Sequence, residues 1–514
     1  MSLKKNSHFV VVGGMIYENY GRALGPYRVR TAAENAGFVT SIIDYPWVLS
    51  QHDMDRLLDH VVGPNTLAIG ISYTWEVASP MQKLNDQPPP IMLVRNYLNR
   101  RGLNVKIILG CATDSRIPPY IRTESDWIIS GFAELSLPAV LQYLAGKNND
   151  LKFESGTVGN RAVNFVNSNT NFVVSDMTQL ETVFEPADNF QSHQPLTIET
   201  CRGCVFSCAY CNYQFKGKKD YQYIRPVENL AEEFRRNYHM FGTTRYMIAD
   251  DTFNDSMEKI DRLRRAVDMA KLPDFEFVCY LRPELLVLRP EMIPALIDLG
   301  LRGAHFGLES YNDQSRRLVG RSSEMVRVID AIRELKSQSP RRIGTLATFI
   351  VGLPHDTKDQ LERDNQHLMS TDNDYLDAWL FGGLMLRNKF AGNTISFNPQ
   401  PGLNRDASAM EMWPEKYGYK VHKLANDKLA AAWHNEHMNS FEADKMAERF
   451  NQQGAPFKSF GGWYVASGWY FGLGEDYMAQ PGNLKMSTLY ELGRQSCVDR
   501  SQQWLAQIAQ DQTP

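Results

Sequence analysis

The chain has 514 residues, of which 43% are hydrophobic and 22% charged, and its net charge is −4. This length favours two to four domains, and the modest charge gives no sign of a nucleic-acid or membrane surface. No apolar run reaches the roughly 18 residues of a spanning helix, and the N-terminus lacks the features of a secretory signal. Seven cysteines, four of them bunched, do not make a disulfide framework in so long a chain. We therefore expect a cytoplasmic protein with a thiol-rich metal site.

The first 148 residues alternate short apolar strands with helical patterns. Strands are predicted at 9–14, 39–45, 66–73, 104–110 and 125–131, with helices at 25–38, 51–62, 91–102 and 133–146. This order predicts a doubly wound, Rossmann-like parallel sheet, which binds ligands beyond the carboxyl ends of its strands. Residues 149–192 are rich in Asn, Ser and Thr and are predicted to be a linker that could hold a small hairpin.

A second α/β series occupies residues 193–388. Its strands are predicted at 196–200, 245–249, 276–280, 303–307, 345–351 and 377–386, and helical patterns separate most of them. Six such units predict a TIM-type β/α barrel, complete or partial. Residues 389–514 are predicted to form a mostly helical extension with an aromatic stretch, which could cap the barrel mouth.

Polar residues follow consecutive strands of the predicted barrel. The cysteines follow the first strand, Asp250, Asp251 and Thr252 the second, Arg282 the third and Glu309 the fourth. The chemistry of parallel α/β barrels lies at the carboxyl ends of their strands. We therefore expect these groups to converge on one face of the barrel as a site.

The cysteines stand in the stretch "CRGCVFSCAYC", residues 201–211. Four thiolates could hold a structural zinc ion, but only three residues separate the two pairs, so wrapping one ion would be cramped. The spacing also differs from a bacterial ferredoxin run. The remaining interpretation takes Cys204, Cys208 and Cys211 as ligands of a 4Fe-4S cluster, with one iron left open and Cys201 surplus.

This pattern, with Tyr210 just before the last cysteine, resembles the signature of the radical S-adenosylmethionine (SAM) superfamily. The stretches "IADDTFNDS", "HFGLESYNDQSRRLVGR" and "FIVGLPHDTKDQL" resemble later motifs of that family in the right order. The resemblance implies that the open iron binds the amino and carboxylate groups of SAM. It also implies reductive cleavage of SAM to a 5′-deoxyadenosyl radical, with an electron donor such as flavodoxin or ferredoxin.

By position in these motifs, the resemblance implies cofactor-binding roles for Tyr210, Asp250, Asp251, Thr252, Arg282, Glu309, Val351 and Gly352. The stretch 250–252 matches the contact to the methionine amino group, and Glu309 matches the carboxylate that meets the ribose. Residues 351 and 352 and the backbone of Tyr210 match contacts to adenine, whereas Arg282 could meet the carboxylate of SAM or the substrate. The alternatives are a helix-capping role for either aspartate, a surface position for Glu309 and an ordinary ion pair for Arg282.

The first domain resembles the cobalamin-binding domain that precedes the barrel in many radical SAM enzymes. "GPYRVRTAAENAGFVTSIIDY" carries the likeness, but Cys111 replaces a common glycine in "KIILGCATDSRIPPY", and Phe132 and Ala133 break the motif in "DWIISGFAELSLPAVL". No D-x-H-x-x-G is present, so no histidine ligand can be assigned. The resemblance implies cobalamin and methyl transfer to an unreactive carbon or phosphorus of a small-molecule or peptide substrate. The alternatives are a rearranging or ring-forming enzyme with a cobalamin-free domain, and a non-catalytic metal-stabilised scaffold.

Overall fold

The computed structural model describes most of the two α/β domains and parts of the C-terminal extension. The described residues are 4, 7–13, 23–72, 88–111, 119–158, 161–168, 176–188, 190, 192, 195–211, 217–218, 220–386, 408–422, 432–453, 499, 501–506 and 508. None of the helices in these ranges is both long enough and apolar enough to cross a membrane.

The N-terminal domain is built on a sheet in the order β2-β1-β3-β4-β5-β7-β6. The five predicted strands are β1 (Phe9–Val12), β2 (Thr40–Ile43), β3 (Ala68–Ser72), β4 (Lys106–Cys111) and β5 (Trp127–Ser130), all parallel. Its helices are α1 (Leu24–Asn35), α2 (Gln51–Val61), α3 (Pro90–Arg101), α4 (Pro119–Arg122) and α5 (Ser136–Leu144). Because strand side chains alternate, Val10 and Val12 pack with α2 and α3, whereas Phe9 and Val11 pack with α1 and α5. The doubly wound sheet predicted from the sequence is confirmed.

The segment predicted to be a linker adds two strands to this sheet. β6 (Glu154–Val158) and β7 (Arg161–Asn167) form an antiparallel hairpin, and β7 pairs in parallel with β5. The polar composition fits an edge hairpin, since β6 is mostly exposed while Val163 and Val166 of β7 are buried. The hairpin therefore belongs to the first domain.

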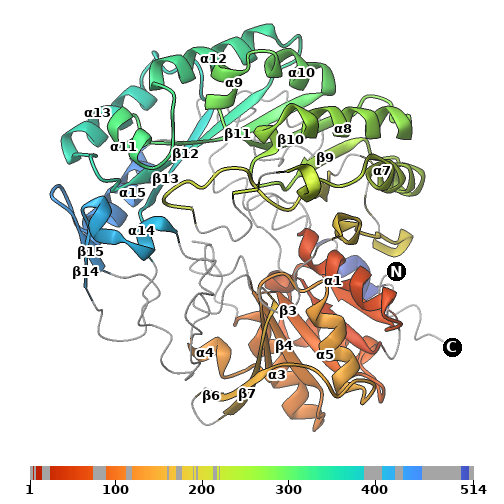
Figure 1. Cartoon of the computed structure of the whole chain (residues 1–514). Coiled ribbons are helices and arrows are strands. Elements are labelled where there is room, and N and C mark those ends of the chain that lie inside the picture. The colour runs from red at the N-terminus through yellow and green to blue at the C-terminus, as the bar shows by residue number, and fades with distance from the viewer. Residues whose placement is uncertain are drawn as a thin grey trace.

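The second domain is a partial barrel of six parallel strands in sequential order. The strands are β8 (Leu196–Ile198), β9 (Arg245–Ile248), β10 (Glu276–Leu281), β11 (Leu301–Glu309), β12 (Gly344–Val351) and β13 (Ala378–Gly383). Its helices are α7 (Val227–Phe241), α8 (Met257–Ala270), α9 (Glu284–Leu288), α10 (Met292–Leu299), α11 (Asp313–Leu318), α12 (Met325–Gln338) and α13 (Lys358–Met369). Figure 1 shows these helices on the outside, with the N-terminal domain below the barrel. The predicted fold class is confirmed.

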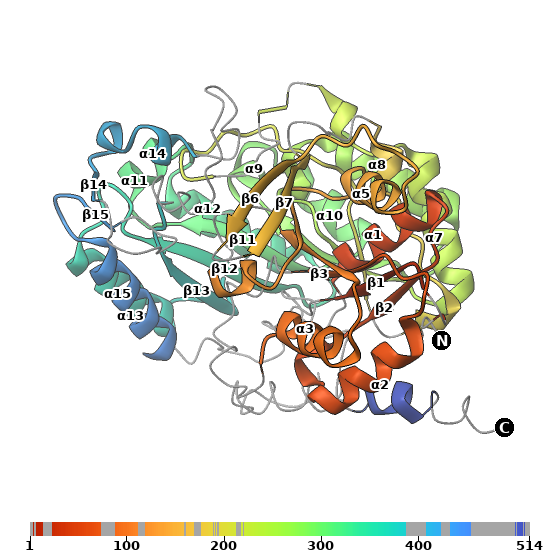
Figure 2. The ribbon, with the colours of Figure 1, turned by 90° about the horizontal axis from the view of Figure 1, so that it is seen from below.

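Residues 408–453 of the C-terminal extension cover one edge of the barrel. They comprise α14 (Ala409–Met412), the antiparallel strands β14 (Lys420–His422) and β15 (Ala432–His434), and α15 (Ser440–Gln453). Residues 501–506 are helical, and Trp504 and Leu505 pack in the core of the N-terminal domain. The Asn451 side chain accepts from the backbone N of Phe381 at 2.9 Å and donates to its carbonyl at 2.8 Å, so α15 satisfies the edge of β13. Figure 2 shows α15 beside α13. The predicted aromatic stretch at 459–474 lies outside the described residues.

Short 3-10 turns connect several of these elements. They are η2 (Pro46–Val48), η5 (Met177–Leu180), η6 (Pro186–Asp188), η7 (Tyr221–Tyr223), η8 (Phe253–Asp255) and η9 (Pro414–Tyr417).

Candidate functional site

Three cysteines of the loop after β8 line one pocket at the carboxyl end of the barrel strands. Cys204, Cys208 and Cys211 face a space of about 270 Å³. The loop is tied to its surroundings, because the backbone N of Ala209 donates to the Val319 carbonyl at 3.0 Å and the backbone N of Lys218 to the Cys204 carbonyl at 3.1 Å. The loop therefore presents three thiols to one space.

Cys201 lies elsewhere. Its side chain is buried with Tyr223 and Ile224, and its thiol donates to the Gly203 carbonyl at 3.6 Å. Burial raises the pKa of the Cys201 thiol well above its ordinary value. Cys201 is not among the residues that line the pocket, so the first of the four sulfurs is separated from the other three.

The two adjacent aspartates after β9 point to different places. Asp250 is buried, and its carboxylate accepts from the Thr200 backbone N at 2.8 Å and the Thr200 hydroxyl at 2.5 Å. Asp251 and Thr252 line the cysteine pocket, and Thr252 lies 3.7 Å from the Cys204 sulfur. The structure therefore places Asp250 in a structural clamp and brings only Asp251 and Thr252 to the site.

Arg282 follows β10 and lies against the cysteine loop. Its Nη1 donates to the Cys208 sulfur at 3.5 Å, and its Nη2 donates to the Gly320 carbonyl at 2.5 Å. The guanidinium carbon sits 3.8 Å from the ring centre of Phe206. Hydrogen bonds to cysteine sulfurs tune iron–sulfur clusters, and Arg282 donates one to the Cys208 sulfur.

Glu309 ends β11 with its carboxylate in the same pocket. It has a left-handed φ of 67° at an irregularity in the pairing of β11 with β12. Tyr210 donates its hydroxyl proton to Glu309 at 2.6 Å, and Arg321 donates to both Glu309 and Tyr210 at 2.5 and 2.6 Å. A Cβ at Gly307 would lie 2.4 Å from the Glu309 carboxylate, so any side chain there would displace that carboxylate. Glu309 is thus a partnered carboxylate of the pocket wall.

Val351 and Gly352 are outside this pocket. The Gly352 carbonyl accepts from the Tyr419 hydroxyl at 2.7 Å, and a Cβ at Gly352 would lie 2.5 Å from the Trp433 ring. The C-terminal extension therefore packs where the resemblance implied adenine contacts. On β12 it is Thr348 that lines the pocket.

Sequence reasoning missed several residues of the pocket wall, among them Tyr280, His305 and Arg321. Burial lowers the pKa of His305 to about 4, so its ring is neutral at pH 7. Arg321 belongs to the stretch "RRLVGR" that supported the resemblance. Two other arginines stand in the same stretch, so the sequence alone does not single out Arg321 as a site residue. The ion pair with Glu309 becomes visible only once β11 and the following helix are placed in space.

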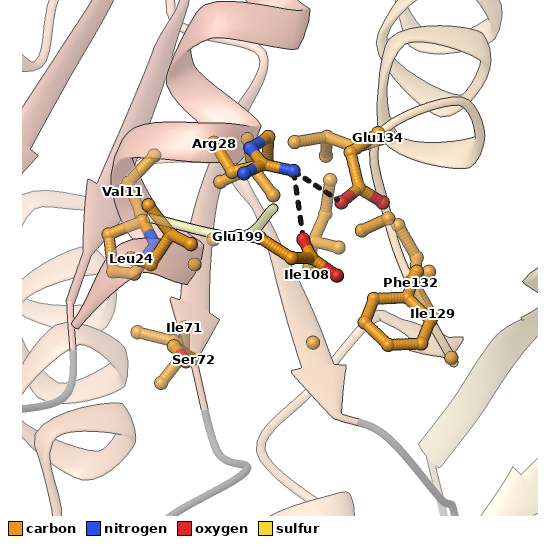
Figure 3. Close-up of a pocket in the computed structure, with 18 of the residues that line it drawn as sticks. Val11, Leu24, Arg28, Ile71, Ser72, Ile108, Ile129, Phe132, Glu134 and Glu199 are labelled. Atoms are coloured by element: carbon orange, nitrogen blue, oxygen red, sulfur yellow. Dashed lines mark hydrogen bonds and ion pairs between the residues drawn. The ribbon is translucent and has the colours of Figure 1, made fainter. Parts of the chain in front are cut away.

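A second pocket of about 440 Å³ lies between the two domains, against the sheet face that α1 and α5 cover, and it reaches the carboxyl ends of β3 and β5. Figure 3 shows its walls, with apolar side chains from these strands and the ring of Phe132. Gly25 lines this pocket, and a Cβ there would meet no atom within 4 Å, so the Gly25 backbone itself is open to the pocket. Asp251 lines this pocket as well as the cysteine pocket, so the two pockets share a wall.

Four charged side chains form one wall of the second pocket. Arg28 lies 3.1 Å from Glu199 and 3.7 Å from Glu134 (Figure 3). Arg202, from the cysteine loop, lies 2.7 Å from each of these carboxylates. Burial by itself raises the pKa of Glu134, but Arg202 and Arg28 outweigh it and hold that pKa below its ordinary value. The wall therefore consists of buried charged residues and is shared by both domains.

The residues present fit the two cofactors implied by the sequence. Three cysteines line one pocket, one of them accepting a hydrogen bond from Arg282, and cysteine is the residue type that holds iron–sulfur clusters. The second pocket combines apolar walls from the sheet with one charged wall, and it reaches the carboxyl ends of strands, where open α/β sheets bind ligands.

Comparisons with known proteins agree with this geometry. The family model of the radical SAM superfamily matches residues 198–368. An uncharacterized methyltransferase of Pyrococcus horikoshii is 24% identical over 181 residues, which cover 35% of this chain and 37% of that protein. The chain thus spans little more than a third of the length of this curated relative.

Two solved structures share the fold of most of the chain. TsrM from Kitasatospora setae, a radical SAM methyltransferase solved with cobalamin and a 4Fe-4S cluster, matches with a TM-score of 0.55 at 15% identity, covering 82% of this chain and 81% of that one. OxsB, a cobalamin-dependent SAM radical enzyme solved with aqua-cobalamin and SAM, matches with a TM-score of 0.52 at 15% identity, covering 72% of this chain and 52% of that one. Residues 198–368 therefore match the radical SAM family model, and most of the chain, including its N-terminal domain, shares the fold of these two solved enzymes.

Proposed function

We propose that this chain is a radical SAM enzyme that binds cobalamin in the pocket between its domains and transfers a methyl group to an unreactive carbon or phosphorus of its substrate. The observation that carries the proposal is that Asp251 lines both pockets. A ligand of the N-terminal pocket and a ligand of the cysteine pocket would face the same wall. A substrate placed there would be within reach of both.

The residues of the chain have distinct tasks under this proposal. When bound, the 4Fe-4S cluster supplies the electron that cleaves SAM, and cobalamin supplies a carrier for a methyl group. Cys204, Cys208 and Cys211 hold the cluster, and Arg282 donates a hydrogen bond to the Cys208 sulfur. Asp251 and Thr252 orient the methionine part of SAM at the pocket they line.

The Glu309–Arg321–Tyr210 group contributes a fixed polar wall to the cysteine pocket. Burial, with Glu309 beside it, raises the pKa of Tyr210 well above its ordinary value in spite of Arg321, so the phenol keeps its proton. The carboxylate of Glu309 accepts from both partners and is aimed at the pocket. We propose that it positions a hydroxyl-bearing part of SAM.

The test is anaerobic reconstitution of the full chain with iron, sulfide and hydroxocobalamin, followed by SAM with a deuterated methyl group and reduced flavodoxin. The expected products are 5′-deoxyadenosine and S-adenosylhomocysteine, and transfer of the deuterated methyl group to a component of a small-molecule extract. Cys208→Ala is the control and should abolish these products, because it removes one of the three cluster thiols.

Other outcomes identify the alternatives. Formation of 5′-deoxyadenosine that is indifferent to cobalamin, without S-adenosylhomocysteine or methyl transfer, would favour a rearranging or ring-forming enzyme. Stoichiometric zinc in the aerobically purified protein, with no SAM cleavage in any condition, would favour a non-catalytic scaffold.

A further inference from the structure

Arg202 stands in the cysteine loop, but its side chain belongs to the N-terminal pocket. Its Nη2 donates to Glu134 at 2.7 Å, its Nε donates to Glu199 at 2.9 Å, and its guanidinium carbon lies 3.9 Å from the ring centre of Phe132. Glu134 and Phe132 come from the segment after β5, whereas Arg202 and Glu199 follow β8. One residue between two cysteines of the loop thus forms part of the wall of the other pocket.

Three side chains of this wall leave a buried polar atom without a hydrogen-bond partner. In the part of the chain that the structure describes, these atoms are Arg28 Nη2, Arg202 Nη1 and Glu134 Oε2. All three residues line the pocket, and each side chain is more than nine-tenths buried. Unpaired buried polar atoms cost free energy, so a ligand group that reaches this wall would gain hydrogen bonds that the protein leaves unmade.

The charges of the wall select the kind of group. Two arginines face two glutamates, so the wall has no net charge. An anionic group would meet Glu134 and Glu199, and a cationic group would meet the two arginines. The unmade bonds comprise two guanidinium donors and one carboxylate acceptor. A neutral group that both accepts and donates fits this set, and a primary carboxamide does so from adjacent atoms.

We infer that Arg28, Glu134 and Arg202 form a subsite for a primary carboxamide of the molecule that occupies the N-terminal pocket. The inference rests on the proposed function, because cobalamin carries primary carboxamides around the rim of its corrin ring. It assigns a ligand-binding role to a residue of the cysteine loop. It also gives Glu134 a role in a segment where Phe132 and Ala133 depart from the motif of the family.

The experiment compares the binding of hydroxocobalamin with that of its monocarboxylic acids, in which one carboxamide has been hydrolysed and the isomers separated. Equilibrium dialysis of the full chain gives each affinity. We expect one acid isomer to bind about 10-fold or more weakly than hydroxocobalamin, since one hydrogen bond to a charged group is lost and a like charge is introduced. This comparison needs no variant, so misfolding cannot obscure it.

Two variants test whether the weaker binding of the acid isomer depends on the proposed subsite. Glu134→Gln removes the repelling charge and should bring the affinities for hydroxocobalamin and the weakest acid isomer within about 3-fold of each other. Arg202→Gln should weaken hydroxocobalamin binding by about 10-fold. Arg95→Gln is the matched control, because Arg95 is a buried arginine of the same domain that contacts Glu124 and Asp126 and is not part of the pocket; its affinity for hydroxocobalamin should not change.

Two results would overturn the subsite and leave the proposed function standing. One is equal binding of every acid isomer and hydroxocobalamin. The other is wild-type discrimination in a folded Glu134→Gln protein, with folding judged by its thermal unfolding. Failure of the wild-type protein to bind hydroxocobalamin at all would instead overturn the cobalamin part of the proposed function, and the subsite with it.

Discussion

Replacement of Asp250 or Asp251 by alanine should separate a structural carboxylate from one at the site. Besides its two bonds from Thr200, Asp250 accepts from the Cys201 backbone N at 3.3 Å and lies 3.7 Å from Lys259 Nζ. It therefore clamps the start of the cysteine loop to the end of β9. Asp251 is exposed and lines both pockets.

The size of the effect follows from these contacts. Removing one partner of a buried ion pair costs about 3–5 kcal/mol, because the other charge loses its compensation. Lys259 keeps Asp255 at 3.2 Å and the Thr252 carbonyl at 2.7 Å, so we expect the lower end of that range, about 3 kcal/mol, for Asp250→Ala. At about 2–4 °C per kcal/mol for a domain of this size, the barrel should melt roughly 6–12 °C lower.

The assay is thermal unfolding of the metal-free proteins, followed by circular dichroism, together with SAM binding to the reconstituted proteins. Asp251→Ala should melt within about 2 °C of wild type, as expected for an exposed position, and should bind SAM more weakly. Equal melting temperatures for Asp250→Ala and wild type would refute the clamp. A loss of stability in Asp251→Ala as large as that in Asp250→Ala would refute the distinction between the two carboxylates.

Three further predictions concern other parts of the molecule. Cys201→Ala should retain the wild-type iron content after reconstitution, whereas Cys204→Ala should lose it; equal losses in an iron assay would show that the first sulfur is needed. Gly352→Ala should destabilise the barrel by about 2 kcal/mol or more, because Gly352 has a φ of 103° and its Cβ would lie 2.5 Å from Trp433; unchanged denaturant unfolding would contradict this packing. Burial raises the pKa of Asp356 to about 7 from an ordinary 3.8, so the folded state holds a proton that the unfolded state releases. Stability should therefore fall as the pH rises through this interval, and Asp356→Asn should flatten that fall in urea titrations at pH 5 and 8; parallel curves for the two proteins would argue against a buried protonated carboxyl.

Much of the fold could be predicted because buried strands and helices leave a periodic pattern of apolar residues in the sequence. The strands of both sheets are short apolar runs between helical patterns, and the predicted ranges agree with β9, β10 and β12 to within a residue or two. The hairpin β6–β7 was harder to predict. One face of an edge hairpin is exposed, so the hairpin has the polar composition of a linker. In the extension, which was predicted to be mostly helical, β14 and β15 form a short antiparallel pair, because pairing between two short segments leaves no local periodicity.

The sequence by itself determined which residues lie at the carboxyl ends of the barrel strands, and that Cys204, Cys208 and Cys211 share a spacing unlike those of zinc knuckles or ferredoxins. Only the tertiary structure decided where each side chain points. Asp250 turns inward while Asp251 faces two pockets, because neighbouring residues of a loop have no fixed periodicity.

Contacts between distant segments were likewise decided by the fold. Arg202 reaches a carboxylate 68 positions earlier in the chain, and Gly352 packs on a tryptophan of the extension. An ion pair or a packing contact of this kind depends on distance in space, and spacing along the chain carries no measure of it. That is why the cysteine ligands could be proposed from eleven residues of sequence, whereas the wall that joins the two pockets required the folded molecule.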